Sequence, residues 1–166
     1  MSIKTPSDLE SQAYIRVDLF EHSGTNVEVW INIKPIYVHW DDTSGRPAAN
    51  QIKVDTSGVV WRVRSVNAAE AGWGPFLYDV AMELATLDGK GLCSDPSHVT
   101  EDALKVWEFY FTRRNDVARK KLPRKIWPTR RDECIQYFYS KSPSLIIPEL
   151  KRLGKWCEVH QTSLPF

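Results

Sequence analysis

The stretch that decides the fold reads Val59-Val-Trp-Arg-Val-Arg-Ser-Val66, then Asn67-Ala-Ala-Glu-Ala-Gly-Trp-Gly-Pro75, then Phe76-Leu-Tyr-Asp-Val-Ala81. Its first part is β-branched and typical of a strand, and its last part opens an apolar stripe of helical period. Glycines where a strand turns into a helix let the backbone approach a ligand, and the free N–H groups of the first helical turn point at that place. The stretch therefore predicts either a tight strand-to-helix turn or a site for a phosphate or pyrophosphate.

The residues before this stretch predict antiparallel strands. The run Tyr14–Phe20 alternates apolar and polar residues, and the run Val27–Lys34 places its four aliphatic residues on one face. These two runs predict a hairpin. A second turn, Asp55–Gly58, joins a short strand over Gln51–Val54 to the strand that begins at Val59.

The residues after it predict two helices. The spacing of apolar residues predicts a helix over Phe76–Leu87, which Gly89-Lys-Gly91 ends. Leu92–Ser94 is short enough to be a buried strand. A second helix begins after Thr100, a good N-cap, with two acidic residues in its first turn.

Prolines interrupt the chain beyond Arg113 and exclude any long element there. This region predicts only short strands or helices around Cys134–Tyr139 and Glu149–Lys155.

The composition is that of an ordinary globular protein. With 166 residues, 42% of them hydrophobic and 26% charged, we expect a single domain spanning residues 1–166. Apolar stretches are too short to span a membrane, and the N-terminus lacks an apolar signal core. Three cysteines without a CxxC pair give neither a zinc knuckle nor a disulfide framework, so we expect a cytoplasmic protein with no membrane partner.

Charge divides the chain into two parts. Residues 1–112 carry 9 Lys+Arg against 16 Asp+Glu, a net of −7, whereas residues 113–166 carry 13 against 5, a net of +8. Nine of those 13 basic residues fall between Arg113 and Arg131. The sequence therefore predicts an acidic body with a basic C-terminal third, 113–166.

The order of these elements and the glycine loop resemble the GCN5-related N-acetyltransferase (GNAT) superfamily. Its signature, Gln/Arg-x-x-Gly-x-Gly/Ala, corresponds to Ala69-Glu-Ala-Gly72-Trp73-Gly74, and its later Asn-x-x-Ala-x-x-Phe-Tyr corresponds to Thr100-Glu-Asp-Ala103-Leu-Lys-Val106-Trp107. The stretch Gly72–Met82, followed by Ser94-Asp-Pro, is similar to small GNAT-like proteins of bacteriophages. The resemblance covers residues 52–115.

The resemblance implies an α/β protein of the α+β type, with a mixed, mainly antiparallel sheet flanked by helices. It also implies that the chain binds acetyl-CoA or a related acyl-CoA and transfers the acyl group to an amine. The residues implied to bind the coenzyme are Val66, Asn67, Gly72, Trp73, Gly74, Pro75 and Phe76. Among them, the backbone around Val66 and Asn67 is expected to polarise the thioester carbonyl.

Two departures from the family pattern bear on catalysis. Ala69 stands at the Gln/Arg position, and Trp107 replaces the tyrosine that in many members protonates the leaving thiolate. An indole cannot deliver a proton at neutral pH, so Tyr110, about one turn along the helix, is the candidate acid, or else a core aromatic. These departures favour a second hypothesis, a catalytically inactive binding module that keeps the fold and contacts nucleic acid or an acidic protein through the basic C-terminal third.

Candidate bases and nucleophiles are scattered. His98, in the loop before the second helix, is expected near the acyl group in the resemblance and is a candidate catalytic residue. Three further residues have side chains that can deprotonate an amine: Glu28, His39 and Glu70. The alternative is that they are ordinary surface residues. No metal site is predicted, since the cluster of His39, Asp41 and Asp42 has no fixed spacing. Cys93 is predicted to be a core side chain, with a Cys93–His98 pair as the alternative.

The basic run has its own possible partners. We predict that Arg119, Lys120, Lys121, Arg124 and Lys125 contact phosphates and that Trp127 stacks on a base. The alternatives are coenzyme phosphates, an acidic protein, or a solvated surface that balances the acidic body. A nucleic acid, or a base within it, is accordingly one candidate for the amine acceptor.

Overall fold

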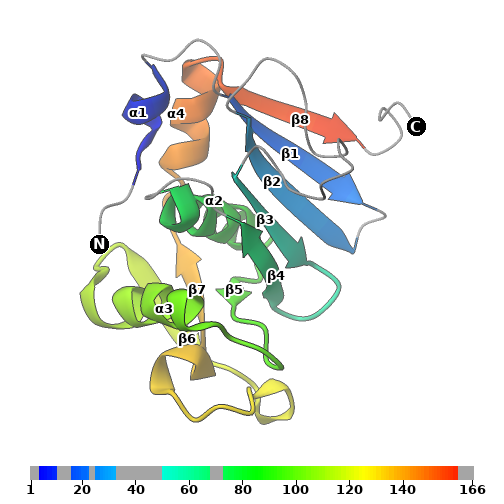
Figure 1. The fold of residues 1–166 in the computed structure, drawn as a ribbon, viewed down its shortest axis with the longest axis vertical. Helices are drawn as coiled ribbons and strands as arrows, with labels where there is room; N and C mark the ends of the chain where they lie inside the picture. The colour runs from blue at the N-terminus through cyan, green and yellow to red at the C-terminus, as the bar shows by residue number, and fades with distance from the viewer. Residues whose placement is uncertain (1–3, 11–15, 23–24, 33–49, 68–72, 161–166) are drawn as a thin grey trace.

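The computed structural model describes residues 4–10, 16–22, 25–32, 50–67 and 73–160. Within them eight strands form one sheet in the order β6-β7-β5-β4-β3-β2-β1-β8 (Figure 1). The strands are β1 (Arg16–His22), β2 (Asn26–Asn32), β3 (Asn50–Asp55), β4 (Trp61–Asn67), β5 (Leu92–Cys93), β6 (Val117–Lys121), β7 (Tyr137–Lys141) and β8 (Trp156–His160). The helices are α1 (Pro6–Glu10), α2 (Trp73–Leu87), α3 (Glu101–Arg113) and α4 (Ile146–Arg152), with 3-10 turns η1 (Arg124–Ile126) and η2 (Glu133–Gln136).

The sheet is mainly antiparallel, with two parallel pairs. Strands β1 to β4 pair in antiparallel fashion one after another, and β7 pairs antiparallel with β5 and β6. The parallel pairs are β4 with β5 and β1 with β8. The predicted fold class, α+β with a mixed, mainly antiparallel sheet flanked by helices, is confirmed.

The predicted hairpin is confirmed as β1 and β2, whose register runs from Arg16 opposite Asn32 to His22 opposite Asn26. The side chains of Val27, Val29 and Ile31 are all buried, as the alternation predicts, because one face of the strand packs on the core. Lys34, the last residue of the predicted run, lies outside the described residues.

Helix α2 is the centre of the core. Eleven of its 15 residues are buried, so this helix is covered on nearly all sides rather than along one stripe. It packs on β2, β3, β4, β5, β7 and α4, and Figure 1 shows it crossing the molecule between α3 and α4. The helix begins at Trp73, three residues before the predicted start, because Gly74 and Pro75 are accommodated in its first turn.

The turn after α2 depends on glycine. Gly89 and Gly91 both have positive φ, 78° and 77°, which supports the prediction that they end the helix. A Cβ at Gly91 would also lie 2.7 Å from the Phe138 ring and 3.0 Å from the Tyr139 carbonyl oxygen. The close approach of this turn to β7 therefore requires glycine.

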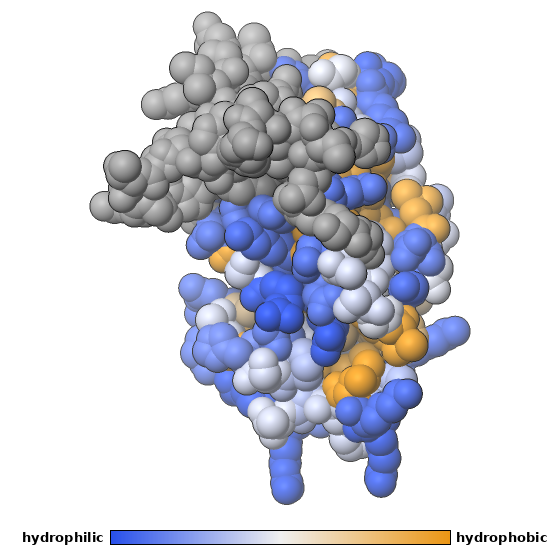
Figure 2. Space-filling view, turned by 90° about the vertical axis from the view of Figure 1, so that its right-hand side faces the viewer, coloured by the Kyte–Doolittle hydropathy of each residue, from blue (hydrophilic) through white to orange (hydrophobic). Residues whose placement is uncertain are grey.

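Helix α3 begins as predicted. The Thr100 hydroxyl accepts a hydrogen bond from the Ala103 N–H at 3.1 Å, and Glu101 and Asp102 occupy the first turn. The basic run contains an element that the sequence did not predict, the edge strand β6, whose residues are mostly exposed. The face of the molecule in Figure 2 is mainly hydrophilic, with apolar residues in small separate patches.

Candidate functional site

Strand β5 is only two residues long, and both residues pair with the first two residues of β4. Trp61 lies opposite Leu92 and Arg62 opposite Cys93, and there the ladder ends. Strand β4 then continues from Val63 to Asn67, a length of about 16 Å at the usual rise per residue. Within the described residues this side of β4 has no neighbouring strand, so its alternate N–H and C=O groups are open to a ligand.

The end of β4 is also irregular. The register passes from Val54 opposite Val63 to Lys53 opposite Ser65, which leaves Arg64 as the extra residue of a β-bulge. A bulge increases the local twist and re-aims the backbone, and bulges are frequent beside active sites. Here the bulge turns the last residues of β4 where the two strands part.

A buried hydroxyl lies directly after the end of β5. Ser94 directly follows β5, is only 4% exposed, and its hydroxyl has no hydrogen-bond partner within the described residues. A buried polar group without a partner costs about 1–3 kcal/mol, so such groups are rare in folded proteins. The Ser94 hydroxyl is therefore free to bind a ligand that reaches the end of β5.

The first turn of α2 carries the positive end of the helix dipole, and no acidic side chain of that turn offsets it. The N–H groups of Trp73 and Gly74 have no partner within the helix, and Pro75 has no N–H. In contrast, α3 has two acidic residues and a side-chain cap. The Lys4 Nζ lies 5.7 Å from the centre of the Trp73 ring and adds a positive charge nearby. This end of α2 favours an anion.

The predicted coenzyme residues divide between the described and the remaining parts of the chain. Val66 and Asn67 end β4 and pair with Ile52 and Gln51 of β3. Trp73, Gly74 and Phe76 are buried and Pro75 is half-buried, all in the first turn of α2. Trp73 and Phe76 pack edge to face, with ring centres 5.5 Å apart. Gly72, the other signature glycine, lies outside the described residues, as do Ala69 and Glu70.

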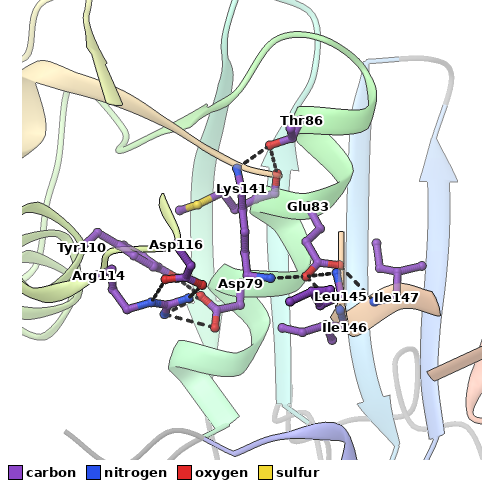
Figure 3. A network of polar contacts seen from close by, with 11 residues as sticks. Asp79, Glu83, Thr86, Tyr110, Arg114, Asp116, Lys141, Leu145, Ile146 and Ile147 are labelled. Carbon is purple, nitrogen blue, oxygen red and sulfur yellow. Dashed lines mark hydrogen bonds and ion pairs between the residues drawn. The ribbon is translucent and has the colours of Figure 1, made fainter. Parts of the chain in front are cut away.

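Tyr110, the candidate acid, is buried and hydrogen-bonded inside the protein. It is 2% exposed, and its hydroxyl donates to Asp79 Oδ1 of α2 at 2.5 Å (Figure 3). Burial, and then the negative charge of Asp79, hold the pKa of Tyr110 well above its usual value of 10.0. The Tyr110 hydroxyl proton is thus held by a carboxylate in the core. That Tyr110 protonates the leaving thiolate stays a prediction.

Trp107 belongs to the core. It is 1% exposed, its ring stacks on Tyr139 with centres 5.5 Å apart, and it meets Tyr78 edge to face at 5.4 Å. The position at which the family resemblance places a tyrosine is therefore filled by a packed aromatic side chain.

Three further candidate bases and nucleophiles, Glu28, Cys93 and His98, lie in the described part of the chain. His98 is exposed in the loop between β5 and α3, and Glu28 is half-buried on β2. The predicted core position of Cys93 is confirmed, and burial raises the pKa of its thiol to about 12. His39, Asp41 and Asp42 lie outside the described residues.

Helix α2 carries two buried carboxylates that sequence reasoning missed. Asp79 receives the Tyr110 hydroxyl and the guanidinium of Arg114, 3.0 Å away. Glu83 is fully buried and accepts from Lys141 Nζ at 2.5 Å. It also accepts from three backbone N–H groups at the start of α4, those of Leu145, Ile146 and Ile147. Figure 3 shows both carboxylates, which hold α3, β7 and α4 against α2.

The signal for this network was present in the sequence. Asp79 and Glu83 are four residues apart within an otherwise apolar helix, so they share a face with buried residues. Carboxylates in that setting need partners. The basic partners, however, come from distant positions that spacing alone does not reveal.

The predicted nucleic-acid residues are exposed on β6 and η1. We call this set the basic surface; it consists of Arg119, Lys120, Lys121, Arg124, Lys125 and Trp127. The Arg119 guanidinium lies over the Phe111 ring at 4.1 Å from its centre, and Lys121 and Arg124 lie over Trp127 at 5.2 and 5.4 Å. Ring contacts therefore bring together Arg119, Lys121, Arg124 and Trp127 at the sheet edge formed by β6, whereas Lys120 lies on the opposite face of the strand.

No protein-family model, curated protein or solved structure matches the chain. In the part of the chain that the structure describes, no helix is long and apolar enough to cross a membrane. The same residues contain no group of three or more His, Cys, Asp or Glu side chains arranged to hold a metal ion.

Proposed function

We propose that this protein is an acyl-CoA-dependent N-acyltransferase that takes acetyl-CoA or a related acyl-CoA and an amine acceptor. The observation that carries the proposal is that the parallel pairing of β4 with β5 ends after two residues, while β4 continues to the segment that leads into α2. In sheets with parallel strands, ligands bind beyond the carboxyl ends of such strands, where a helix begins. The resemblance of the glycine loop to the GNAT signature is the reason for choosing an acyl-CoA as the ligand.

The pyrophosphate of the coenzyme is assigned to the first turn of α2. The N–H groups of Trp73 and Gly74 are the donors, and Gly74 has no side chain to block the approach. The missing acidic residue in this turn and the nearby Lys4 charge support an anionic ligand.

The amide-containing arm of the coenzyme is assigned to the open side of β4. An extended ligand with amide groups can pair with a strand edge as another strand would. The backbone from Val63 to Asn67 offers that edge, and the Ser94 hydroxyl offers a further donor after the end of β5. This placement gives a hydrogen-bond partner to the buried Ser94 hydroxyl.

The acyl transfer follows from this placement. The amine nitrogen attacks the thioester carbonyl carbon, the C–N bond forms, the C–S bond breaks, and the amine proton passes to the coenzyme sulfur. Of Val66 and Asn67, the residue whose N–H faces away from β3 is proposed to donate to the carbonyl oxygen as it gains negative charge. Holding the two reactants together supplies much of the remaining rate enhancement.

A second candidate function is coenzyme binding without catalysis. It is favoured by the buried Trp107 and by the commitment of the Tyr110 hydroxyl to Asp79, because together they leave no proton donor at the family's position. Release of free coenzyme thiol from acetyl-CoA in the presence of lysine peptides, polyamines or nucleic acid distinguishes the two. Tight coenzyme binding with no thiol release for any acceptor favours the binding module.

Calorimetric titration of coenzyme A into Gly74→Val tests the site. A branched side chain at Gly74 blocks the approach of the pyrophosphate, so binding should be lost while circular dichroism stays unchanged. The matched control is Gly58→Val before β4, where an added Cβ meets only the Val60 backbone, at 3.4 Å or more. Equal affinity in both variants would remove the assignment of the pyrophosphate to α2.

A further inference from the structure

We propose that the basic surface binds single-stranded nucleic acid through its phosphate backbone, an interaction that does not depend on the proposed coenzyme site. It lies on β6 and the turn η1, three strands away from β4 in the sheet order. Figure 1 shows β6 at the lower edge of the molecule, away from β8 at the other edge of the sheet.

The positive charge of this surface is not neutralised within the described residues. No ion pair to a carboxylate joins Arg119, Lys120, Lys121, Arg124 or Lys125 in that part of the chain. Two carboxylates that flank the basic run in sequence have other partners, since Asp116 pairs with Arg114 at 2.8 Å and Asp132 with Arg130 at 2.7 Å. The surface therefore keeps five cations for an external anion, which argues against a surface that merely balances the acidic body.

Aromatic rings and carbonyls hold several of these cations in place. Arg119 lies over Phe111 and donates to the Phe111 carbonyl oxygen at 3.0 Å. Lys121 lies between the rings of Tyr137 and Trp127, 5.1 and 5.2 Å from their centres, and donates to Gln136. Arg119 and Lys121 are alternate residues of one strand, so they share a face with about 6.7 Å between them. Cations fixed in a row are suited to successive phosphates, because less side-chain entropy is lost on binding.

Trp127 supplies a platform for an unpaired base. Its side chain is 37% exposed, and its indole N–H donates to the Leu122 carbonyl oxygen at 2.8 Å, which fixes the ring. Bases stack on exposed aromatic rings only when they are free of a duplex, and cations beside the ring then contact the adjoining phosphates. A single strand fits this combination of groups better than a duplex.

Protection of a sheet edge does not account for the whole surface. Lysines on an edge strand prevent unwanted pairing with another chain, and β6 is an edge strand. Arg124, Lys125 and Trp127, however, lie beyond β6, in η1 and just after it. An acidic protein would use the cations without requiring the exposed indole.

The primary test is fluorescence anisotropy with a labelled single-stranded DNA of about 20 nucleotides, longer than one such site covers. The logarithm of affinity should fall with the logarithm of salt concentration at up to about −3.5, since each phosphate contact on a single strand contributes about −0.7. Absence of binding at about 50 mM salt, where charge interactions are strong, would overturn the proposal.

A matched pair of variants separates a local surface from overall charge. Lys121→Gln with Arg124→Gln removes two exposed charges beside Trp127, and Lys53→Gln with Lys151→Gln removes two exposed charges elsewhere. The first double variant should move the salt slope toward zero by about 1.4, and the second should leave it unchanged. Equal effects of the two would contradict a defined binding surface.

Trp127→Leu tests the base contact. Affinity should fall about 5- to 150-fold without a change in the salt slope, because stacking and phosphate contacts are separate contributions. Circular dichroism checks that the variant is folded. Unchanged affinity in folded Trp127→Leu, or displacement of the DNA by poly-glutamate at the same charge concentration, would overturn the nucleic-acid assignment in favour of an acidic protein.

Discussion

The Tyr110 hydroxyl donates a 2.5 Å hydrogen bond to Asp79 Oδ1, and this bond joins α3 to α2 inside the core. Asp79 is 4% exposed and its other contact is the Arg114 guanidinium, so the three groups form one buried unit. Their arrangement explains how a carboxylate is tolerated in the central helix. It also means that the Tyr110 hydroxyl, one turn along α3 from Trp107, already donates its proton to a carboxylate of the core.

Tyr110→Phe should lower the free energy of unfolding by about 1–3 kcal/mol, because a buried carboxylate loses a donor while the ring still packs. If this is its main role, turnover with any accepted amine should change by less than tenfold. Urea unfolding and initial rates of thiol release measure the two quantities. A fall in turnover of about 10²–10⁴ at unchanged stability would instead identify Tyr110 as the acid.

Asp79 should make stability depend on pH in a defined direction. Burial raises its pKa above 3.8, and Arg114 only partly opposes this, so the folded state holds the proton more readily than the unfolded state. Its contribution to stability is therefore largest below the ordinary value and is lost as pH rises through the raised folded pKa.

Urea unfolding of the protein and of Asp79→Asn, at several pH values from about 3 upward, measures that contribution. The free energy of unfolding of the unmodified protein, minus that of the variant, should fall as pH rises and then level off. A difference that increases with pH would mean that the Arg114 charge, not burial, controls the carboxyl.

Ser94→Ala should separate binding from stability. Removal of a buried hydroxyl that has no partner within the described residues should leave the free energy of unfolding unchanged or slightly higher. Affinity for coenzyme A should fall by about 1 kcal/mol if this hydroxyl binds the ligand. Ser97→Ala, three residues on in the exposed loop, is the matched control and should not change affinity. A loss of stability without a loss of affinity in Ser94→Ala would place the hydroxyl in the fold alone.

Local patterns were sufficient to predict the elements that have a clear period. The hairpin of β1 and β2, helix α2 and the Thr100 cap of α3 follow from alternation, from 3.6-residue spacing and from capping chemistry. Strand β6 was missed because Val117–Lys121 has almost no apolar alternation. Pairing with β7, rather than any local preference, makes this segment a strand.

The candidate site was predictable only where it depends on one segment. The glycine loop marks the start of α2, but the parting of β4 and β5 depends on where a two-residue strand pairs, which the sequence of Leu92 and Cys93 does not reveal. The lack of a hydrogen-bond partner for the Ser94 hydroxyl depends on the groups that the fold places around it, which the sequence does not show. The Asp79 and Glu83 partners are likewise brought close by the fold, from 31 to 64 residues away.

Thermal and urea unfolding with and without coenzyme A tests the central claim most directly, that a coenzyme binds where β4 and β5 part. A ligand that binds only the folded state, at about 100 times its dissociation constant, should raise the free energy of unfolding by roughly 2.7 kcal/mol. The account predicts that increase for the unmodified protein and a smaller one for Ser94→Ala at the same concentration. No increase at millimolar coenzyme A would contradict it.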